Sequence, residues 1–493
     1  MSFPSAWRLV LALFAAGTAA CAAPSVTLVS PTMNEQYLEG VTVPVEAVVA
    51  AGTDVARVEF LANGAPIGGA TEPPYRVDYP IGAALNHRFV ARLTTRDGAT
   101  VDSAPLTCVR YTQLDRQYLS YDYEEHVVDR QWQARLWMPA DLETVRGLLI
   151  VSNPGGGDSR DWYRFVWYRE FLHLNHFAFV GVQGSNSHAD SIPPLLHAID
   201  QWAEETGHPE LRNAPFVATG FSSGGGYSSR LLVTLPERVI GVGIVSSRIK
   251  LTDVVVRPEL LAVPGLVVGG ELENLGQVVE VEVLNVYRPQ GALYGWATVQ
   301  GGEHTMGDQD GLVMPYLQAA LDARYPADAD PRRGPVALRP LAPDSGWLAD
   351  HTTWASGLTT IAPAAGYPGD LRDTSWLVNQ DVAYIYRAYA TYDRPLRIVS
   401  PDPNWWENGG GRVWEPGSDA TIVVDTTGFA DWTKLEFYDG ARLLGTVTSG
   451  APQFTATALA PGYHALHVLG TNAAGQQRPS QPVLVTVRAA NDT

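Results

Sequence analysis

Ser222 is the residue whose surroundings point most directly to chemistry. It is the centre of a G-x-S-x-G pattern that lies between an apolar run at 214–220 and a helical pattern at 227–235. A serine on a sharp strand-to-helix turn exposes its hydroxyl, and flanking glycines remove the Cβ atoms that would clash there. The N-terminus of the following helix favours negative charge. The pattern therefore predicts that Ser222 is a nucleophile.

A nucleophilic serine needs a histidine that accepts its proton. In a strand–turn–helix setting of this kind the histidine lies in the loop after the last strand of the sheet. His304 fits this place, because it follows the apolar run at 293–302 in the loop sequence GGEHTMGD. We expect His304 to take the proton from Ser222 and to return it to the leaving group.

The acid that orients the histidine should follow an earlier strand, between the serine and the histidine along the chain. Glu273 meets this condition, since it comes directly after the apolar run at 264–270. Its carboxylate would hold the imidazole of His304 and stabilise the charged form of the ring. Glu271 and Asp308 are alternatives that the spacing leaves open.

Hydrolysis through a serine also needs two backbone amides that stabilise the oxyanion of the tetrahedral intermediate. One is expected from Ser223, the residue after the nucleophile. The other is expected from the glycine-rich loop 153–158, which follows an early apolar run and reads NPGGGD. Within this loop Gly156 and Gly157 are the favoured donors, because glycine allows the backbone to approach a ligand closely.

The middle of the chain must supply the strands and helices that position these groups. Its apolar runs are 147–152, 177–184, 214–220, 239–247, 264–270 and 293–302. Leu195, Ile199 and Trp202 recur at helical spacing between the second and third runs. Strands that alternate with helices predict an α/β domain, a mostly parallel sheet with helices on both faces. We place it at 115–395, including a tail rich in aromatic residues.

Two stretches at opposite ends of the chain resemble each other. Each opens on an apolar run ending in Ser-Pro and then has two apolar runs joined by an Asn-Gly or Asp-Gly turn, at 58–69 and 435–446. This is the signature of a β-hairpin within an all-β sandwich. The stretches resemble bacterial Ig-like modules over 25–112 and 396–489. We expect them to act as spacers, with ligand or polymer binding as the alternative.

The middle segment resembles serine esterases of the α/β-hydrolase fold. The resemblance covers about 115–325 by motif and strand order and extends into the aromatic tail. Two departures from the family pattern concern the site. The family commonly has G-E-x-D where this chain has Gly270-Glu271-Leu272-Glu273, and it often has HGGG where this chain has NPGGG.

The N-terminal residues predict export. Arg8, the apolar run 9–16 and the small residues at 18–24 fit a signal peptide over 1–22. The protein is then extracellular or periplasmic, and a lipid anchor at Cys21 is the alternative outcome of processing. Cys108 is the only other cysteine, so we expect no disulfide.

Charge and motifs exclude several classes of protein. The net charge of −18 repels phosphate backbones, which argues against nucleic-acid binding. No run after residue 24 reaches 18 apolar residues, so no transmembrane helix is expected. The chain has neither CxxC nor HExxH, and we expect no metal and no cofactor.

The predicted function is therefore hydrolysis of a carboxylic ester through an acyl-enzyme. The flanking modules favour an extracellular polymer, such as an acylated polysaccharide, as the source of the ester. The first alternative is a serine peptidase of the prolyl-oligopeptidase type, which shares the serine motif. The second is a binding or adhesion protein whose hydrolase domain is inactive.

Overall fold

The computed structural model describes residues 24–31, 36–38, 40–82, 86–111, 118–127, 130–155, 157–183, 191–249, 256–306, 310–401, 413–414, 417 and 419–487. The predicted signal peptide and Cys21 lie outside these residues. The chain forms two compact units. The first covers the residues up to Tyr111, and the second covers nearly all of the rest.

The first unit is built of strands alone. They are β1 (Val26–Ser30), β2 (Gln36–Leu38), β3 (Thr42–Val49), β4 (Val55–Ala62), β5 (Ala65–Ala70), β6 (Tyr75–Pro80), β7 (Asn86–Thr95), β8 (Thr100–Asp102) and β9 (Leu106–Tyr111). Two sheets form, in the orders β1-β3-β6 and β2-β9-β7-β4-β5, and β8 pairs with β7. Alternate residues such as Val58 and Phe60 are fully buried, as in a strand with one face on a core. Cys108 is buried in the same core.

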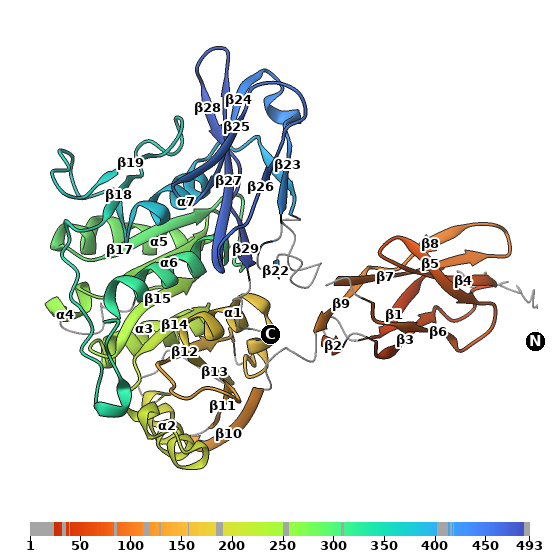
Figure 1. Ribbon diagram of the computed structural model, residues 1–493, viewed down its shortest axis with the longest axis horizontal. Helices are drawn as coiled ribbons and strands as arrows, with labels where there is room; N and C mark the ends of the chain where they lie inside the picture. The colour runs from red at the N-terminus through yellow and green to blue at the C-terminus, as the bar shows by residue number, and fades with distance from the viewer. Residues whose placement is uncertain are drawn as a thin grey trace, which may run out of the picture. The chain divides into compact units, whose positions relative to one another are not determined.

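The second unit is organised around an eight-stranded sheet (Figure 1). Its strands are β10 (Tyr118–Val127), β11 (Arg130–Pro139), β12 (Gly147–Ser152), β13 (Phe177–Gln183), β14 (Phe216–Phe221), β15 (Val239–Val245), β16 (Gly265–Gly270) and β17 (Tyr294–Val299). Their order in space is β10-β11-β13-β12-β14-β15-β16-β17. β11 is antiparallel to both of its neighbours, and all pairs from β13 to β17 are parallel.

Helices accompany this sheet in the chain order that the apolar runs predict. They are α1 (Val166–Asn175), α2 (Ile192–Thr206), α3 (Ser223–Thr234), α4 (Pro258–Leu261), α5 (Asn274–Val281), α6 (Asp310–Arg324) and α7 (Gln380–Ala390). The prediction of a helix carrying Leu195, Ile199 and Trp202 on one face is confirmed, because all three are buried in α2. In the described part of the chain, no helix combines the length and the apolar character that crossing a membrane requires.

The sheet has a hydrophobic core on each face. Leu148 and Ile150 of β12 belong to one core, with side chains of α2 and α3. Leu149 and Val151 of the same strand belong to the other, with side chains of α1, α6 and α7. Successive side chains of a strand point to opposite faces, so side chains of helices pack on both faces of the sheet. The carboxyl ends of its parallel strands then remain as the place where loops can gather.

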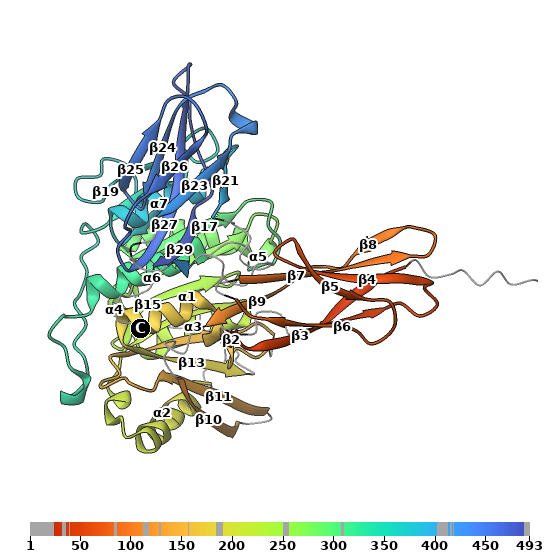
Figure 2. The same cartoon turned by 45° about the vertical axis from the view of Figure 1, so that its right-hand side comes forward.

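After α6 the chain adds a small antiparallel sheet and then more strands. The small sheet consists of β18 (Trp347–Asp350), β19 (Thr360–Pro363) and β20 (Thr374–Leu377). The later strands are β21 (Arg397–Ser400), β22 (Val413–Trp414), β23 (Ala420–Asp425), β24 (Trp432–Asp439), β25 (Arg442–Val447), β26 (Gln453–Ala456), β27 (Gly462–Asn472), β28 (Gln477–Pro479) and β29 (Val483–Val487). Among them, β27 and β29 pack against α6, and β27 also packs against α7 (Figure 2).

The C-terminal strands repeat the topology of the first unit. Their sheets have the orders β21-β23-β26 and β22-β29-β27-β24-β25, with β28 paired to β27. Each of these strands corresponds in order to one of β1 to β9, which explains the internal sequence repeat. Ala465 and Leu484 of this C-terminal sandwich are buried in the core shared by α6 and α7. The sandwich is thus packed against the α/β part of the second unit.

Candidate active site

Ser222 occupies the turn between β14 and α3 with an unusual backbone conformation. Its φ is 55° and its ψ is −121°, outside the regions that residues with a side chain normally adopt. Such a conformation costs about 1–3 kcal/mol and persists only where the surrounding structure imposes it. The amide of Ser222 donates to the carbonyl of Val245 (2.8 Å), and its carbonyl accepts from the amide of Gly226 (3.0 Å). These bonds hold the turn on both sides.

Two glycines allow the helix to begin so close to the sheet. A Cβ atom on Gly220 would lie 2.4 Å from the carbonyl carbon of Gly224. A Cβ atom on Gly224 would lie 2.1 Å from the carbonyl oxygen of Ser152, at the end of β12. The first turn of α3 therefore packs directly on the ends of β12 and β14, and no side chain fits there.

Replacing Gly224 with alanine is expected to destabilise the second unit. A clash with backbone in a packed region costs about 1–3 kcal/mol of unfolding free energy, and more where the backbone cannot shift. The usual effect of this replacement in a helix is the opposite, a gain of roughly 0.5–1 kcal/mol. Urea unfolding followed by tryptophan fluorescence measures the change, because residues 24–111 contain no tryptophan.

Gly357→Ala is the matched control for this variant. A Cβ atom on Gly357 meets nothing within 4 Å, so its replacement should leave the urea midpoint almost unchanged. If both variants unfold at the same urea concentration as the wild-type protein, the close packing of α3 on β12 is contradicted.

Ser222, His304 and Glu273 form a continuous hydrogen-bonded chain. The Nε2 atom of His304 lies 2.9 Å from the Oγ atom of Ser222. The Nδ1 atom of His304 lies 2.6 Å from the Oε1 atom of Glu273. The Glu273 side chain is buried, whereas the His304 side chain is 47% exposed. The arrangement suits a base that is open to substrate and an acid that is shielded from water.

The loops after β16 and β17 bring the acid and the base together. The end of β16 and the loop after β17 approach each other so closely that a Cβ atom on Gly270 would lie 2.2 Å from the carbonyl oxygen of Glu303. The Gly270 amide also lies 3.4 Å from Oε2 of Glu273, which holds the second carboxylate oxygen. The ring of Phe221 lies 4.9 Å from the ring of His304, centroid to centroid, and supports the base from the side of β14.

The two other candidates for the acid have different places. The Oε2 atom of Glu271 accepts a hydrogen bond from the amide of Gly301 (2.8 Å), so this carboxylate fixes the loop that carries the histidine. Asp308 lies outside the described residues. Of the two glutamates after β16, the structure brings Glu273 into contact with His304.

The predicted oxyanion donors have three different outcomes. Ser223 is the first residue of α3, and the first amides of a helix have no acceptor within the helix. Gly156 lies outside the described residues. The structure disagrees with the predicted role of Gly157, because its amide donates to the carbonyl of Pro154 (2.7 Å) and is engaged in a turn.

The glycine-rich loop is tied to the serine turn by a contact that sequence reasoning missed. The amide of Gly155 donates to the Oγ atom of Ser223 (2.6 Å). Gly155 has a φ of 54°, which glycine adopts readily. The only signals in the sequence were the run of glycines and the second serine of the motif. The side chain of Ser223 therefore positions the loop, while its amide remains the candidate oxyanion donor.

A charged pair stabilises the end of the same loop. Arg160 donates to the carboxylate of Asp158 through its backbone amide (2.9 Å) and its guanidinium (2.8 Å). Burial would raise the pKa of Asp158, but the hydrogen bonds from Arg160 hold this pKa below its usual range. The carboxylate therefore stays ionised with its charge balanced.

Among the described residues, no group of three or more His, Cys, Asp or Glu side chains could hold a metal ion.

Comparison with known proteins gives a family for the N-terminal segment. The family model for a bacterial Ig domain matches residues 24–91, so the first predicted Ig-like module is confirmed. No curated protein matches the chain. The fibronectin(III)-like modules of Clostridium thermocellum CbhA are 26% identical, with 17% of this chain and 94% of that chain covered and a TM-score of 0.17.

Other similar solved structures are mostly esterases, at low identity and TM-score. The S-formylglutathione hydrolase of Staphylococcus aureus is 13% identical, with 42% of this chain and 98% of that chain covered and a TM-score of 0.33. An esterase of Pyrobaculum calidifontis is 15% identical, with 39% of this chain and 78% of that chain covered and a TM-score of 0.28.

Proposed function

We propose that this protein is a serine hydrolase that cleaves carboxylic esters through an acyl-enzyme. The observation that carries the proposal is the chain of hydrogen bonds from Ser222 through His304 to Glu273. The strained backbone of Ser222 supports it, because such conformations gather at functional sites. Strand order, the antiparallel β11 and the serine turn after β14 support assignment of 115–395 to the α/β-hydrolase fold.

The first half of the reaction forms the acyl-enzyme. His304 accepts the hydroxyl proton of Ser222 at Nε2 while Oγ forms a bond to the ester carbonyl carbon. The negative charge that develops on the carbonyl oxygen is stabilised by the amide of Ser223, with Gly156 as the second donor. The bond to the alcohol oxygen then breaks, and the alcohol leaves with the proton from His304.

The second half repeats these steps with water. His304 takes a proton from water, and the hydroxyl oxygen bonds to the acyl carbon. The bond to Oγ breaks, the carboxylic acid leaves, and Ser222 regains its proton. Throughout, Glu273 holds the ring through Nδ1 and stabilises the imidazolium form that each proton transfer creates.

We further propose that the enzyme is exported, extracellular or periplasmic, and acts on esters of an extracellular polymer, such as an acylated polysaccharide. The bacterial Ig domain at 24–91 supports an extracellular or surface location. The repeated topology of the C-terminal strands supports a second Ig-like module at 396–489, after the first at 25–112. A lipid anchor at Cys21 is part of this proposal as an alternative to release.

Labelling with a fluorophosphonate probe tests the activated serine. The probe phosphonylates a serine only where a base activates it, so we expect one adduct, on the peptide that contains Ser222. Ser222→Ala should remain unlabelled, while Ser228→Ala, a variant of a buried serine in α3, should label like the wild-type protein. Absence of any adduct on the folded protein would contradict the proposal and favour an inactive hydrolase fold.

A comparison of two small substrates separates an esterase from a peptidase. Faster turnover of a p-nitroanilide than of a p-nitrophenyl ester would favour a peptidase instead.

A further inference from the structure

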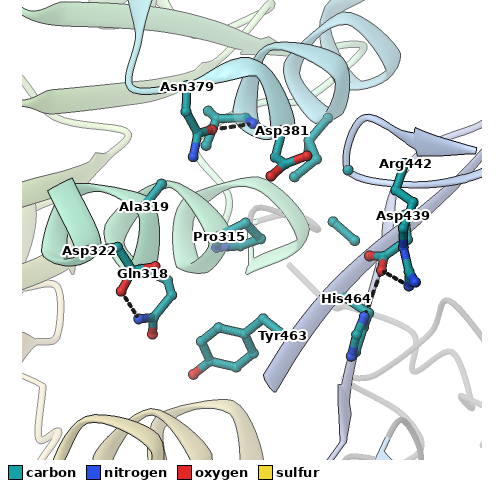
Figure 3. Close-up of a pocket in the computed structure, with 14 residues that line it drawn as sticks. Pro315, Gln318, Ala319, Asp322, Asn379, Asp381, Asp439, Arg442, Tyr463 and His464 are labelled. Atoms are coloured by element: carbon teal, nitrogen blue, oxygen red, sulfur yellow. Dashed lines mark hydrogen bonds and ion pairs between the residues drawn. The ribbon is translucent and has the colours of Figure 1, made fainter. Parts of the chain in front are cut away.

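A cavity of about 330 Å³ lies between the α/β part of the second unit and its C-terminal sandwich. Residues of α6 and α7 line one side, and residues around the β24–β25 turn and the start of β27 line the other (Figure 3). None of Ser222, Glu273 and His304 lines it. The volume falls within the range of about 300–1,000 Å³ that is typical of pockets for small ligands.

Hydrogen bonds between the two sides hold the cavity in shape. The Oδ1 atom of Asp381, near the start of α7, accepts from the amide of Ala441 in the β24–β25 turn (2.9 Å). The hydroxyl of Tyr463, at the start of β27, donates to the carbonyl of Trp167 in α1. Because both bonds connect the sandwich with helices of the α/β part, the cavity is formed by the folded unit and does not need a ligand to assemble.

Three carboxylates provide acceptors. In each, one oxygen is engaged and fixes the group: Asp322 accepts from Gln318 (3.0 Å), Asp381 accepts from Ala441, and Asp439 accepts from His464 (2.8 Å). Within the part of the chain that the structure describes, the other oxygen of each carboxylate has no hydrogen-bond partner. These oxygens can accept from a ligand without breaking a bond of the protein.

Donors stand beside these acceptors. Asn379 uses its Oδ1 atom to cap α7 at the amide of Val382 (2.9 Å), which leaves its NH₂ group to donate. The guanidinium of Arg442 bonds to Asp439 through one nitrogen (2.9 Å) and has further N–H groups. Apolar groups make up another part of the wall. They are Pro315, Ala319, Val382, Ile385 and Ala465, with the ring of Tyr463.

This combination selects the ligand by its chemistry. An anion would be repelled by the carboxylates, and the donors would contribute nothing to the binding of a simple cation. A hydroxyl group both donates and accepts, so neighbouring hydroxyls can use both kinds of group at once. We propose that this cavity binds a neutral sugar, a mono- or disaccharide unit of a glycan, with its hydroxyls on the polar groups and its C–H face on the apolar wall. This glycan site is separate from the proposed ester-cleaving centre.

Calorimetric titration of the full-length protein with xylobiose, cellobiose and mannobiose tests the proposal. We expect at least one of them to bind with a dissociation constant in the micromolar to millimolar range. Asp322→Ala should weaken that binding about tenfold or more, because it removes a charged hydrogen-bond acceptor. Ala319→Leu should abolish it by filling the cavity. Asp328→Ala removes an exposed carboxylate outside the cavity and should bind like the wild-type protein.

The outcome is independent of the proposed catalytic activity, since hydrolysis of a small ester should be the same in Asp322→Ala and the wild-type protein. The circular dichroism spectrum of each variant shows whether it is folded. Failure of all three disaccharides to bind would overturn the assignment. So would binding that neither Asp322→Ala nor Ala319→Leu weakens, because the sugar would then bind elsewhere. Binding of a diamine such as putrescine in place of the sugars would identify the cavity as a cation site instead.

Discussion

Replacing Ser222 with alanine should lower kcat for ester hydrolysis by about a million-fold. The variant keeps the hydrogen bond between His304 and Glu273 but has no atom that can form the acyl-enzyme. The Ser222 backbone that accepts from Gly226 is also retained, so the fold should be unaffected. Steady-state hydrolysis of p-nitrophenyl acetate, combined with circular dichroism of the same sample, measures both expectations.

The histidine variant shows whether the two residues act as one unit. His304→Ala should cost about as much as Ser222→Ala, because a hydroxyl without a base is a poor nucleophile. The double variant should be no slower than either single variant, since groups that act together in one step are strongly non-additive. Additive losses, or a rate for His304→Ala close to that of the wild-type protein, would show that the 2.9 Å contact between His304 and Ser222 has no catalytic role.

Much of the site could be predicted from the sequence because its signals are local. The apolar run at 147–152 is β12 without a change of boundary, and the run at 264–270 corresponds to β16. The glycines on either side of Ser222 indicate that two backbone segments approach each other closely. The structure confirms this, because a Cβ atom on Gly220 would lie 2.4 Å from the carbonyl carbon of Gly224. The chain order of serine, acid and histidine follows from the order of these strands.

What the sequence did not indicate depends on contacts between distant segments. The cavity depends on the hydrogen bond between Asp381 and the amide of Ala441, which lies 60 residues further along the chain. No local pattern in the sequence predicts that contact. The predicted role of Gly157 as an oxyanion donor failed for a different reason. A run of three glycines leaves the direction of each amide open, and the turn that closes on Pro154 uses the amide that the sequence had favoured.

Glu271 and Glu273 could not be separated by spacing, because both follow β16 within three residues. In the structure the two glutamates have different hydrogen-bond partners. Glu271 accepts from a backbone amide at Gly301, whereas Glu273 accepts from the ring of His304 at 2.6 Å and is the more buried of the two. A buried carboxylate against the imidazole stabilises the charged ring during both proton transfers, while a carboxylate on a loop amide contributes only to the position of the loop.

Glu273→Ala should therefore lower kcat by about ten-thousand-fold, less than the loss of the serine or the histidine. Glu271→Ala should lower kcat by about a hundredfold at most, since its carboxylate bonds to a loop amide and a hydrogen bond to a charged group contributes about 1.5–3 kcal/mol. Rates on p-nitrophenyl acetate for the two variants, measured together, decide between the carboxylates. The reverse ranking would move the role of the acid to Glu271, and two small losses would mean that His304 is oriented by a third group.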